Sequence, residues 1–193
     1  MRVLIAYGSR YGSTEEIAHK IAEYLSEENI ETTVVDVKKE KKWPLFDGYD
    51  GVIVGSGIKI SKWMREPQQF LELRSHDLKK MKLAVYISCI SIINDPEYTQ
   101  KELLEKIFKE TDVEPVLYEA FGPLIDMSSS SRMGFLDKII SKTVITGLNN
   151  DLKLNLNMNG RNDLRDWEKI REFTNKFIKI LNKFSEKLEK IGI

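Results

Sequence analysis

A short loop near the start of the chain combines hydroxyl side chains with glycine. It runs from Gly8 to Thr14, directly after the apolar run Arg2–Tyr7, and contains the hydroxyls of Ser9, Ser13 and Thr14. An amphipathic helical pattern begins at the end of the loop. The first N–H groups of a helix have no partner within the helix, and the helix dipole is positive there. Together with the hydroxyls, these groups predict a site for a phosphate monoester.

Two other phosphate-binding motifs fit this loop poorly. A P-loop ends in Gly-Lys-Ser/Thr, whereas Gly12 is followed by Ser13 and Thr14 with no lysine. A dinucleotide fingerprint has three glycines in the pattern G-x-G-x-x-G, whereas this loop has only Gly8 and Gly12. A loop with many hydroxyls and few glycines favours one terminal phosphate, such as that of FMN. The alternative is an ordinary strand-to-helix turn in which Ser13 and Glu16 form a capping box.

Composition narrows the class of protein. The chain has 193 residues, 41% of them hydrophobic, which suits a single domain over residues 1–193. Lysine plus arginine (30) equals aspartate plus glutamate (30), a balance that argues against nucleic acid as a partner. Cys89 is the only cysteine, so we expect no disulfide and no metal site within the chain. No apolar stretch reaches the roughly 20 residues of a bilayer span, and we expect a cytoplasmic protein without a signal peptide or transmembrane segment.

The elements that must position the loop alternate along the chain. Strand-like apolar runs are separated by helical patterns in most intervals, which predicts an α/β fold with a parallel sheet covered on both faces. The expected strands are Arg2–Tyr7, Thr32–Val37, Val52–Gly55, Leu83–Ser88 and Val116–Phe121. In such folds ligands bind beyond the carboxyl ends of the strands. The segments after the first, third and fourth strands are therefore the candidate site.

The second and third of these segments could hold a planar ligand. Gly55–Trp63 offers small residues that let the backbone approach a ring, followed by apolar side chains. Ser88–Pro96 is unusually apolar for a loop in water, and a planar apolar ligand beside it would account for this. The alternative is that Ile90, Ile92 and Ile93 simply complete a core strand.

Residues 122–165 exceed a minimal alternation of five strands and five helices, and we interpret them as an insertion before the last helix. Phe135 to Ile145 form an amphipathic stretch, and the alternation from Leu152 to Met158 predicts a short half-buried strand. The insertion is either a lid, a substrate wall or a peripheral membrane contact through residues 133–148, or else a cover for the sheet edge. A final helix begins near Asp166, and its apolar stripe from Trp167 to Leu188 predicts core packing.

These features together resemble flavodoxin-like FMN proteins, and most of all their menaquinone-dependent protoporphyrinogen dehydrogenase branch. The resemblance covers nearly the whole chain. It rests on the segments Ser9–Ala18, Tyr49-Asp50, Gly55–Lys59, Phe135–Lys138 and Asp166–Glu168. It implies a doubly wound, five-stranded parallel sheet of strand order 2-1-3-4-5, with helices on both faces, and FMN as the cofactor.

The resemblance also implies a set of cofactor-binding residues. The phosphate would be held by Ser9, Arg10, Tyr11, Gly12, Ser13 and Thr14. The flavin ring would lie between Ser56, Gly57, Ile58 and Lys59 on one side and Ser88, Cys89, Ile90, Ser91 and Asn94 on the other. Electron-carrying flavodoxins usually stack aromatic residues on the ring, but this chain offers Lys59 and isoleucines there. We interpret Trp63 as an anchor packed on the sheet and Cys89 as a buried thiol.

We expect a two-electron flavin oxidoreductase that accepts electrons from a reduced organic substrate, in the resembled branch a porphyrinogen, and passes them to a quinone. No side chain stands out as a catalytic acid or base. The first alternative is a one-electron carrier between redox proteins, and the second is a scaffold that binds no flavin. The sequence leaves the substrate, the acceptor and the oligomeric state open.

Overall fold

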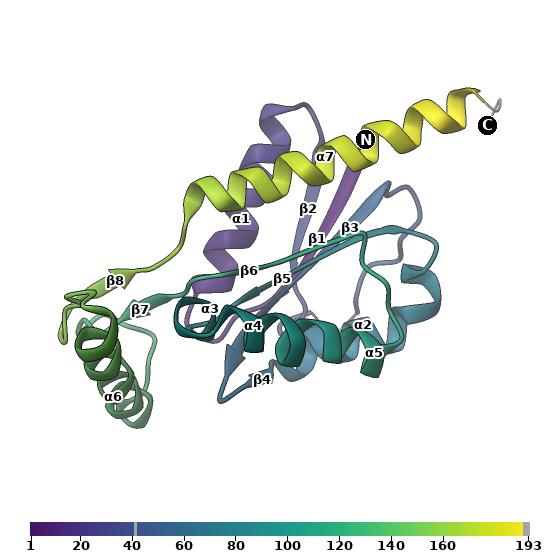
Figure 1. Cartoon of the computed structure of the whole chain (residues 1–193). Helices are drawn as coiled ribbons and strands as arrows, with labels where there is room; N and C mark the ends of the chain where they lie inside the picture. The colour runs from purple at the N-terminus through teal and green to yellow at the C-terminus, as the bar shows by residue number, and fades with distance from the viewer. Residues whose placement is uncertain (41, 191–193) are drawn as a thin grey trace.

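The computed structural model describes residues 1–40 and 42–190, and the side chains of residues 185–190, including Leu188, lie outside the described part. Five parallel strands form the central sheet in the order β2-β1-β3-β5-β6 (Figure 1). They are β1 (Arg2–Gly8), β2 (Glu31–Asp36), β3 (Gly51–Lys59), β5 (Lys82–Ser88) and β6 (Leu117–Phe121). The predicted α/β class and the predicted order of the five parallel strands are confirmed.

The central sheet has a short additional strand that was not predicted. β4 (Lys62–Trp63) pairs antiparallel with the end of β3 and forms a hairpin where the sequence suggested a loop. Ile60 and Ser61 connect the two strands and both have positive φ angles, 49° and 54°. Two left-handed residues form the tight turn that best matches the twist of a hairpin, although glycine or asparagine is the usual choice there. The sequence signal for this hairpin was therefore weak.

Helices cover both faces of the sheet, as predicted (Figure 1). α1 (Ser13–Glu27) and α7 (Trp167–Lys190) lie on one face, where Ile17, Ile170 and Phe177 are completely buried against the strands. α2 (Arg65–Leu78), the π-helical segment η1 (Thr99–Glu105) and α5 (Lys106–Thr111) cover the other face. The stripe on α7 is core packing as far as its side chains are described. At roughly 25 cal/mol per Å² of buried apolar surface, these two cores supply most of the drive to fold.

The segment after β5 is helical and is not a continuation of the strand. β5 ends at Ser88, and two single-turn helices follow, α3 (Ser91–Asn94) and α4 (Pro96–Tyr98). The alternative in which the isoleucines complete a core strand is therefore wrong. Ile92 packs on the core that lies under α2, η1 and α5, whereas Ile90 packs against residues of the insertion.

The insertion contains a small hairpin and a helix. β7 (Leu124–Asp126) pairs antiparallel with β8 (Arg161–Asp163), and α6 (Phe135–Leu152) lies between them in sequence. The strand expected over residues 152–158 is absent, so that prediction is wrong. Lys153 and Asn155 have left-handed φ angles of 55° and 54°, which interrupt an extended backbone. The side-chain amide of Asn149 bonds both the N–H and the carbonyl of Leu156, and it holds this turn against the end of α6.

Ion pairs fasten the insertion to α1. The buried Arg165 guanidinium donates to Asp163 Oδ1 at 2.7 Å and to Glu16 Oε2 at 2.8 Å, and Arg161 also reaches Glu16. Burial alone would raise the pKa of Asp163, but the pairing with Arg165 outweighs it and holds the pKa below its usual value. The buried pairs of Arg165 therefore join the end of the insertion to α1.

Candidate functional site

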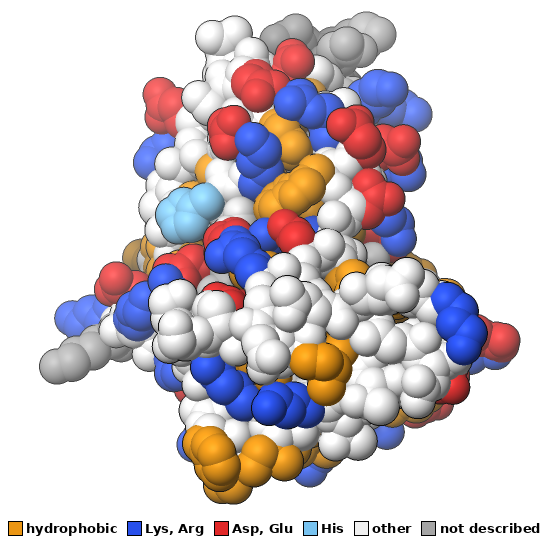
Figure 2. Space-filling view, turned by 90° about the vertical axis from the view of Figure 1, so that its left-hand side faces the viewer, with side chains coloured by type: hydrophobic (Ala, Val, Ile, Leu, Met, Phe, Trp, Pro, Cys, Tyr) orange, Lys and Arg blue, Asp and Glu red, His pale blue; other side chains and the backbone are white. Residues whose placement is uncertain are grey.

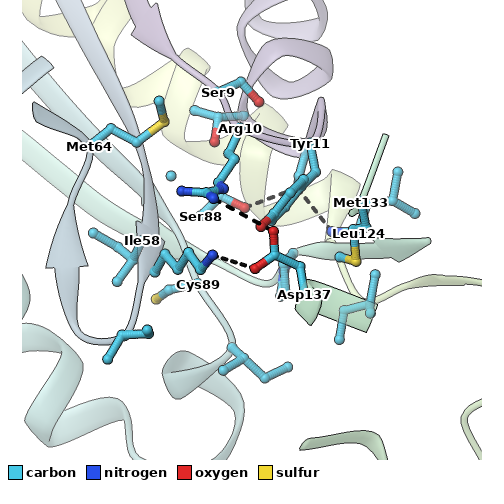
Figure 3. Close-up of a pocket in the computed structure, with 18 of the residues that line it drawn as sticks. Ser9, Arg10, Tyr11, Ile58, Met64, Ser88, Cys89, Leu124, Met133 and Asp137 are labelled. Carbon is cyan, nitrogen blue, oxygen red and sulfur yellow. Dashed lines mark hydrogen bonds and ion pairs between the residues drawn. The ribbon is translucent and has the colours of Figure 1, made fainter. Parts of the chain in front are cut away.

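A cavity of about 1090 Å³ lies at the carboxyl ends of β1, β3 and β5 (Figure 3). All three predicted segments reach it, and the insertion forms its opposite wall. The structure thus brings together most of the predicted site residues. Those that line the cavity are Ser9, Arg10, Tyr11, Ser13, Thr14, Gly57, Ile58, Lys59, Ser88, Cys89 and Ile90.

The phosphate loop ends in a helix start that no side chain caps. Gly12 is the N-cap of α1, and its φ of 103° is a conformation that side chains rarely adopt. Its N–H donates to Ser9 Oγ at 3.0 Å, which folds the loop back on itself. Because α1 has no side-chain cap, the capping box proposed for Ser13 and Glu16 is wrong. The first N–H groups of α1 remain directed toward the cavity end of the helix.

Ser13 connects three parts of the molecule. Its Oγ accepts from the N–H of Leu124 at 2.9 Å and lies 3.0 Å from Ser88 Oγ, which in turn reaches the carbonyl of Gly122 at 3.5 Å. This chain of hydrogen bonds gives both hydroxyls a partner. It holds the loop, the end of β5 and the start of the insertion in one arrangement. Ser13 therefore positions the loop as well as lining the cavity.

The floor beneath the loop is built around Thr14 and Gly57. A Cβ at Gly57 would lie 3.2 Å from Thr14 Oγ1, a tight contact that would press on the loop, so glycine favours the close approach of the strand. The carbonyl of Thr14 accepts from the buried Tyr86 hydroxyl at 3.0 Å. Neighbouring Ser56 is fully buried and does not line the cavity. Its Oγ donates to the carbonyl of Gly57 and accepts from the N–H of Met64, which stabilises the hairpin.

The third segment contributes fewer groups than predicted. Cys89 and Ile90 line the cavity, but Ser91 and Asn94 do not, and neither Gly12 nor Ser56 contributes to its lining. The Ser91 hydroxyl donates to Cys89 Sγ at 3.4 Å and accepts from Thr99, while Asn94 is exposed on α3. Burial raises the pKa of the Cys89 thiol. Cys89 is thus a neutral buried thiol, as the sequence suggested.

Asp137 of α6 reaches into the cavity and meets two cations (Figure 3). Lys59 Nζ donates to Asp137 Oδ1, and Arg10 lies 3.6 Å from Oδ2. The hydrogen bond from Lys59 holds the pKa of Asp137 below its ordinary value, and the same contact raises the pKa of Lys59. The buried hydroxyl of Tyr11 faces this pair without a hydrogen-bond partner among the described residues, and burial raises its pKa. These contacts of Asp137 with Lys59 and Arg10 cross the cavity between β3 and α6, and we call them the latch.

The sequence predicted that the insertion could form a wall of the site, but it did not identify the residues that line this wall. Its lining residues include Arg132, Met133, Asp137, Ile140, Ser141 and Val144. The amphipathic pattern of residues 135–145 did signal a helix, but no local signal showed that Asp137 would turn toward Lys59. Trp63 is an anchor, as interpreted: it is buried, and its Nε1 donates to the carbonyl of Leu103 at 2.6 Å.

The outer side of α6 carries an exposed apolar patch, which we define as Phe135, Leu136, Ile139 and Ile140. Phe135 is 79% exposed and Leu136 is 73% exposed. Hydrophobic side chains gather at the lower end of the corresponding face in Figure 2. Ile140 also lines the cavity, so the patch continues into the cavity mouth. In the part of the chain that the structure describes, no helix has the length and apolar character needed to cross a bilayer.

A doubly wound parallel sheet, with a hydroxyl-rich loop after its first strand and a cavity at the carboxyl ends, defines a ligand-binding α/β protein. The flavodoxin domain family model matches residues 4–151, and the chain belongs to this family.

Other relatives are similar over shorter or more divergent stretches. Protoporphyrinogen IX dehydrogenase (quinone) of Escherichia coli strain K12 is 31% identical over 86 residues, which are 45% of this chain and 47% of that protein. The protein of the same name from E. coli O157:H7 matches equally well. The match thus spans about half the length of these curated relatives.

Two solved flavodoxins have the same fold over nearly the whole chain. Oxidised flavodoxin 1 of Bacillus cereus has a TM-score of 0.55 at 20% identity and covers 93% of this chain and 98% of its own. The flavodoxin of Streptococcus pneumoniae TIGR4 has a TM-score of 0.51 at 17% identity, with coverage of 95% and 99%. At this identity the likeness concerns the fold alone.

Proposed function

We propose that this chain binds FMN and catalyses the two-electron oxidation of a reduced organic substrate by a quinone. Each turnover takes two electrons and two protons from the substrate and delivers them to the quinone, which leaves as the quinol. The bound flavin would supply the hydride-accepting chemistry. The protein's own residues would hold the cofactor, exclude water and admit the second molecule.

The observation that carries this proposal is the size and lining of the cavity. Its volume of about 1090 Å³ is slightly above the roughly 300–1,000 Å³ of small-molecule sites. The phosphate loop and the ends of β3 and β5 form one side, while Met133, Ile140 and Val144 give the opposite wall an apolar character. This arrangement suits a planar cofactor with a second planar molecule beside it.

The residues around the cavity fit the proposed cofactor. The uncapped start of α1 and the hydroxyls of Ser9 and Thr14 match the needs of a terminal phosphate. The backbone of Gly57 and the side chain of Ile58 would contact one face of the ring. Ile90 would provide a second apolar side chain. Trp63 of the second segment lines the cavity but is held by its bond to Leu103, so we expect no aromatic stacking there and one ring face accessible to a reactant. We assign no catalytic acid or base.

The substrate class rests on similarity. The E. coli relatives are named for protoporphyrinogen IX and quinone, and the matched stretch is 31% identical to this chain. We propose a porphyrinogen as the electron donor on this ground, with the insertion wall as its binding surface. The latch of Asp137 with Lys59 and Arg10 would have to open to admit a molecule of that size.

We also propose that the apolar patch on α6 rests on an anionic lipid surface, from which a lipid-soluble quinone would be drawn. Two observations support this occupant. Lys142 is exposed on the same helix and Lys138 is partly exposed, whereas the acidic Asp137 turns inward. Apolar side chains flanked by lysines are typical of helices that lie in a membrane interface.

Anaerobic stepwise reduction of the FMN-loaded protein tests the proposal against electron carriage. We expect the oxidised visible spectrum to convert to the fully reduced one in a single two-electron step. Addition of a water-soluble naphthoquinone should then restore the oxidised spectrum. Two well-separated one-electron steps would instead favour the carrier, and a protein that retains no flavin after desalting would contradict both functions.

A further inference from the structure

Arg132, which lies between β7 and α6 in the insertion, covers the phosphate loop. The guanidinium Nη1 is 3.3 Å from the position that a Cβ would occupy at Gly12, and the three nearest atoms to that position all belong to Arg132. The side chain is 64% exposed and lines the same cavity as Ser9 and Thr14. An arginine from a distant segment therefore covers the loop that starts α1.

The present partner of Arg132 is itself an anion. The guanidinium donates to Glu15 Oε2 in the first turn of α1, and this contact lowers the pKa of Glu15. Other cations lie nearby: Arg10 and Lys59 face Asp137, Lys39 lies 3.9 Å from Glu15 Oε1, and Lys38 and Arg65 also line the cavity. Arg132 is the cation whose guanidinium lies directly over Gly12, so it is placed to meet a second anion that enters the loop.

A phosphate monoester carries roughly 1.5 to 2 negative charges at neutral pH. The loop supplies hydroxyls and N–H groups, which are dipoles and leave that charge uncompensated. The planar guanidinium matches phosphate oxygens with two parallel N–H donors, and such charge-assisted bonds are about twice as strong as neutral ones. With several donors, Arg132 could keep one contact with Glu15 while it reaches the loop.

We propose that Arg132 is a phosphate-binding residue that the insertion contributes to the cofactor site. The bound phosphate would then tie the insertion to the phosphate loop, so that cofactor binding stabilises the wall beside the second reactant. This inference rests on the proposed function, because FMN is the phosphate ester in question.

The test compares FMN with riboflavin, which has the same ring and no phosphate. The dissociation constant of each is measured by flavin fluorescence in the wild type, in Arg132→Gln and in Arg161→Gln. Arg161 is the matched control, because it is an exposed arginine of the same insertion that pairs with Glu16, the next acid of α1, and it does not line the cavity.

We expect Arg132→Gln to weaken FMN binding by roughly ten- to hundredfold, as for a hydrogen bond to a charged group, and to change riboflavin binding less than twofold. Arg161→Gln should leave both values within twofold of the wild type. Arg132→Lys should recover part of the FMN affinity through its charge. An equal loss for FMN and riboflavin, or no loss for FMN, would overturn the inference.

The binding results would differ if the proposed function is wrong. If the wild type binds neither flavin, FMN is not its cofactor, and inorganic phosphate then tests Arg132 by itself. In that case phosphate must raise the Tm of the wild type more than the Tm of Arg132→Gln. Equal increases, or none in either protein, would refute the role of Arg132 as well.

Discussion

Gly12 shows how much the site depends on single residues. Its left-handed backbone lets the chain turn from β1 into α1 while its N–H reaches Ser9 Oγ. A side chain at this position would be strained by its φ and would also crowd Arg132. The geometry of the phosphate loop therefore depends on the absence of a side chain at one position.

Gly12→Ala should lower the free energy of unfolding by about 1–2 kcal/mol, the cost of a left-handed conformation in a residue with a Cβ. Gly147→Ala is the matched control, because Gly147 lies within α6 and a Cβ there meets no atom within 4 Å. That change should stabilise the protein by about 0.5–1 kcal/mol. Urea unfolding of the three proteins measures both effects, and a harmless Gly12→Ala would refute the loop argument.

Asp137 is a second single residue on which the site depends, because its carboxylate accepts the hydrogen bond of the latch. Its side chain is only 17% exposed and receives Lys59, so its removal should free α6 from the hairpin of β3 and β4. Asp137→Asn should speed FMN dissociation by roughly two- to fivefold, the range of a partly exposed ion pair. Asp151→Asn, an exposed acid at the far end of α6, should leave the rate unchanged. Stopped-flow displacement of FMN measures the rate, and equal rates in both variants would contradict the latch.

At the scale of elements, the contact between β8 and α1 fixes where the insertion stands. Arg165 is almost fully buried and is satisfied by Asp163 and Glu16. Since the pKa of Asp163 is lowered on folding, its ionised form adds stability above the unfolded value of about 3.9. That contribution is lost as the pH falls through the folded value.

Asp163→Asn should therefore be less stable than the wild type at pH 7, by roughly 1 kcal/mol because Asp163 is partly exposed. The difference should shrink below about pH 4, where the carboxyl of the unfolded chain begins to take up a proton, and vanish as the folded carboxyl is protonated at lower pH. Urea unfolding at pH 7, 4 and 3 checks this. A difference that stays constant over this range would mean that ionisation of Asp163 does not contribute.

The apolar patch of α6 gives a second prediction for an element. Phe135→Ser with Leu136→Ser should reduce co-sedimentation with vesicles of phosphatidylcholine and phosphatidylserine by at least half, because two exposed apolar anchors are lost. Leu73→Ser on α2 removes a side chain of similar exposure, 72%, and should have no effect. Equal binding by all three proteins would show that the patch does not contact lipid.

For the molecule as a whole, the sequence predicted the sheet and the convergence of three loops, because both follow from apolar periodicity and parallel topology. It did not predict long-range pairings. Ser13 has the pattern of a cap, yet its hydroxyl bonds Ser88, 75 residues away. The leucine alternation after α6 indicates a strand, but Lys153 and Asn155 turn left-handed there. Periodicity indicates which face of an element is apolar. It does not indicate which distant polar group will lie next to a given side chain.

We propose that the molecule has a cofactor side, formed by the sheet loops, and a reactant side, formed by the insertion. Both sides border one cavity, whose apolar wall continues to the patch on α6. If the two sides act together, the molecule is an enzyme with a built-in acceptor site. If only the cofactor side acts, it is a carrier that gives single electrons to another protein.

Anaerobic single-turnover mixing of the reduced, FMN-loaded protein decides between these functions most directly. One sample is mixed with a water-soluble naphthoquinone and another with an oxidised cytochrome c as the redox-protein probe. The account predicts one quinol per flavin, formed much faster than the cytochrome is reduced. Rapid reduction of two cytochromes per flavin, with little reaction of the quinone, would contradict it.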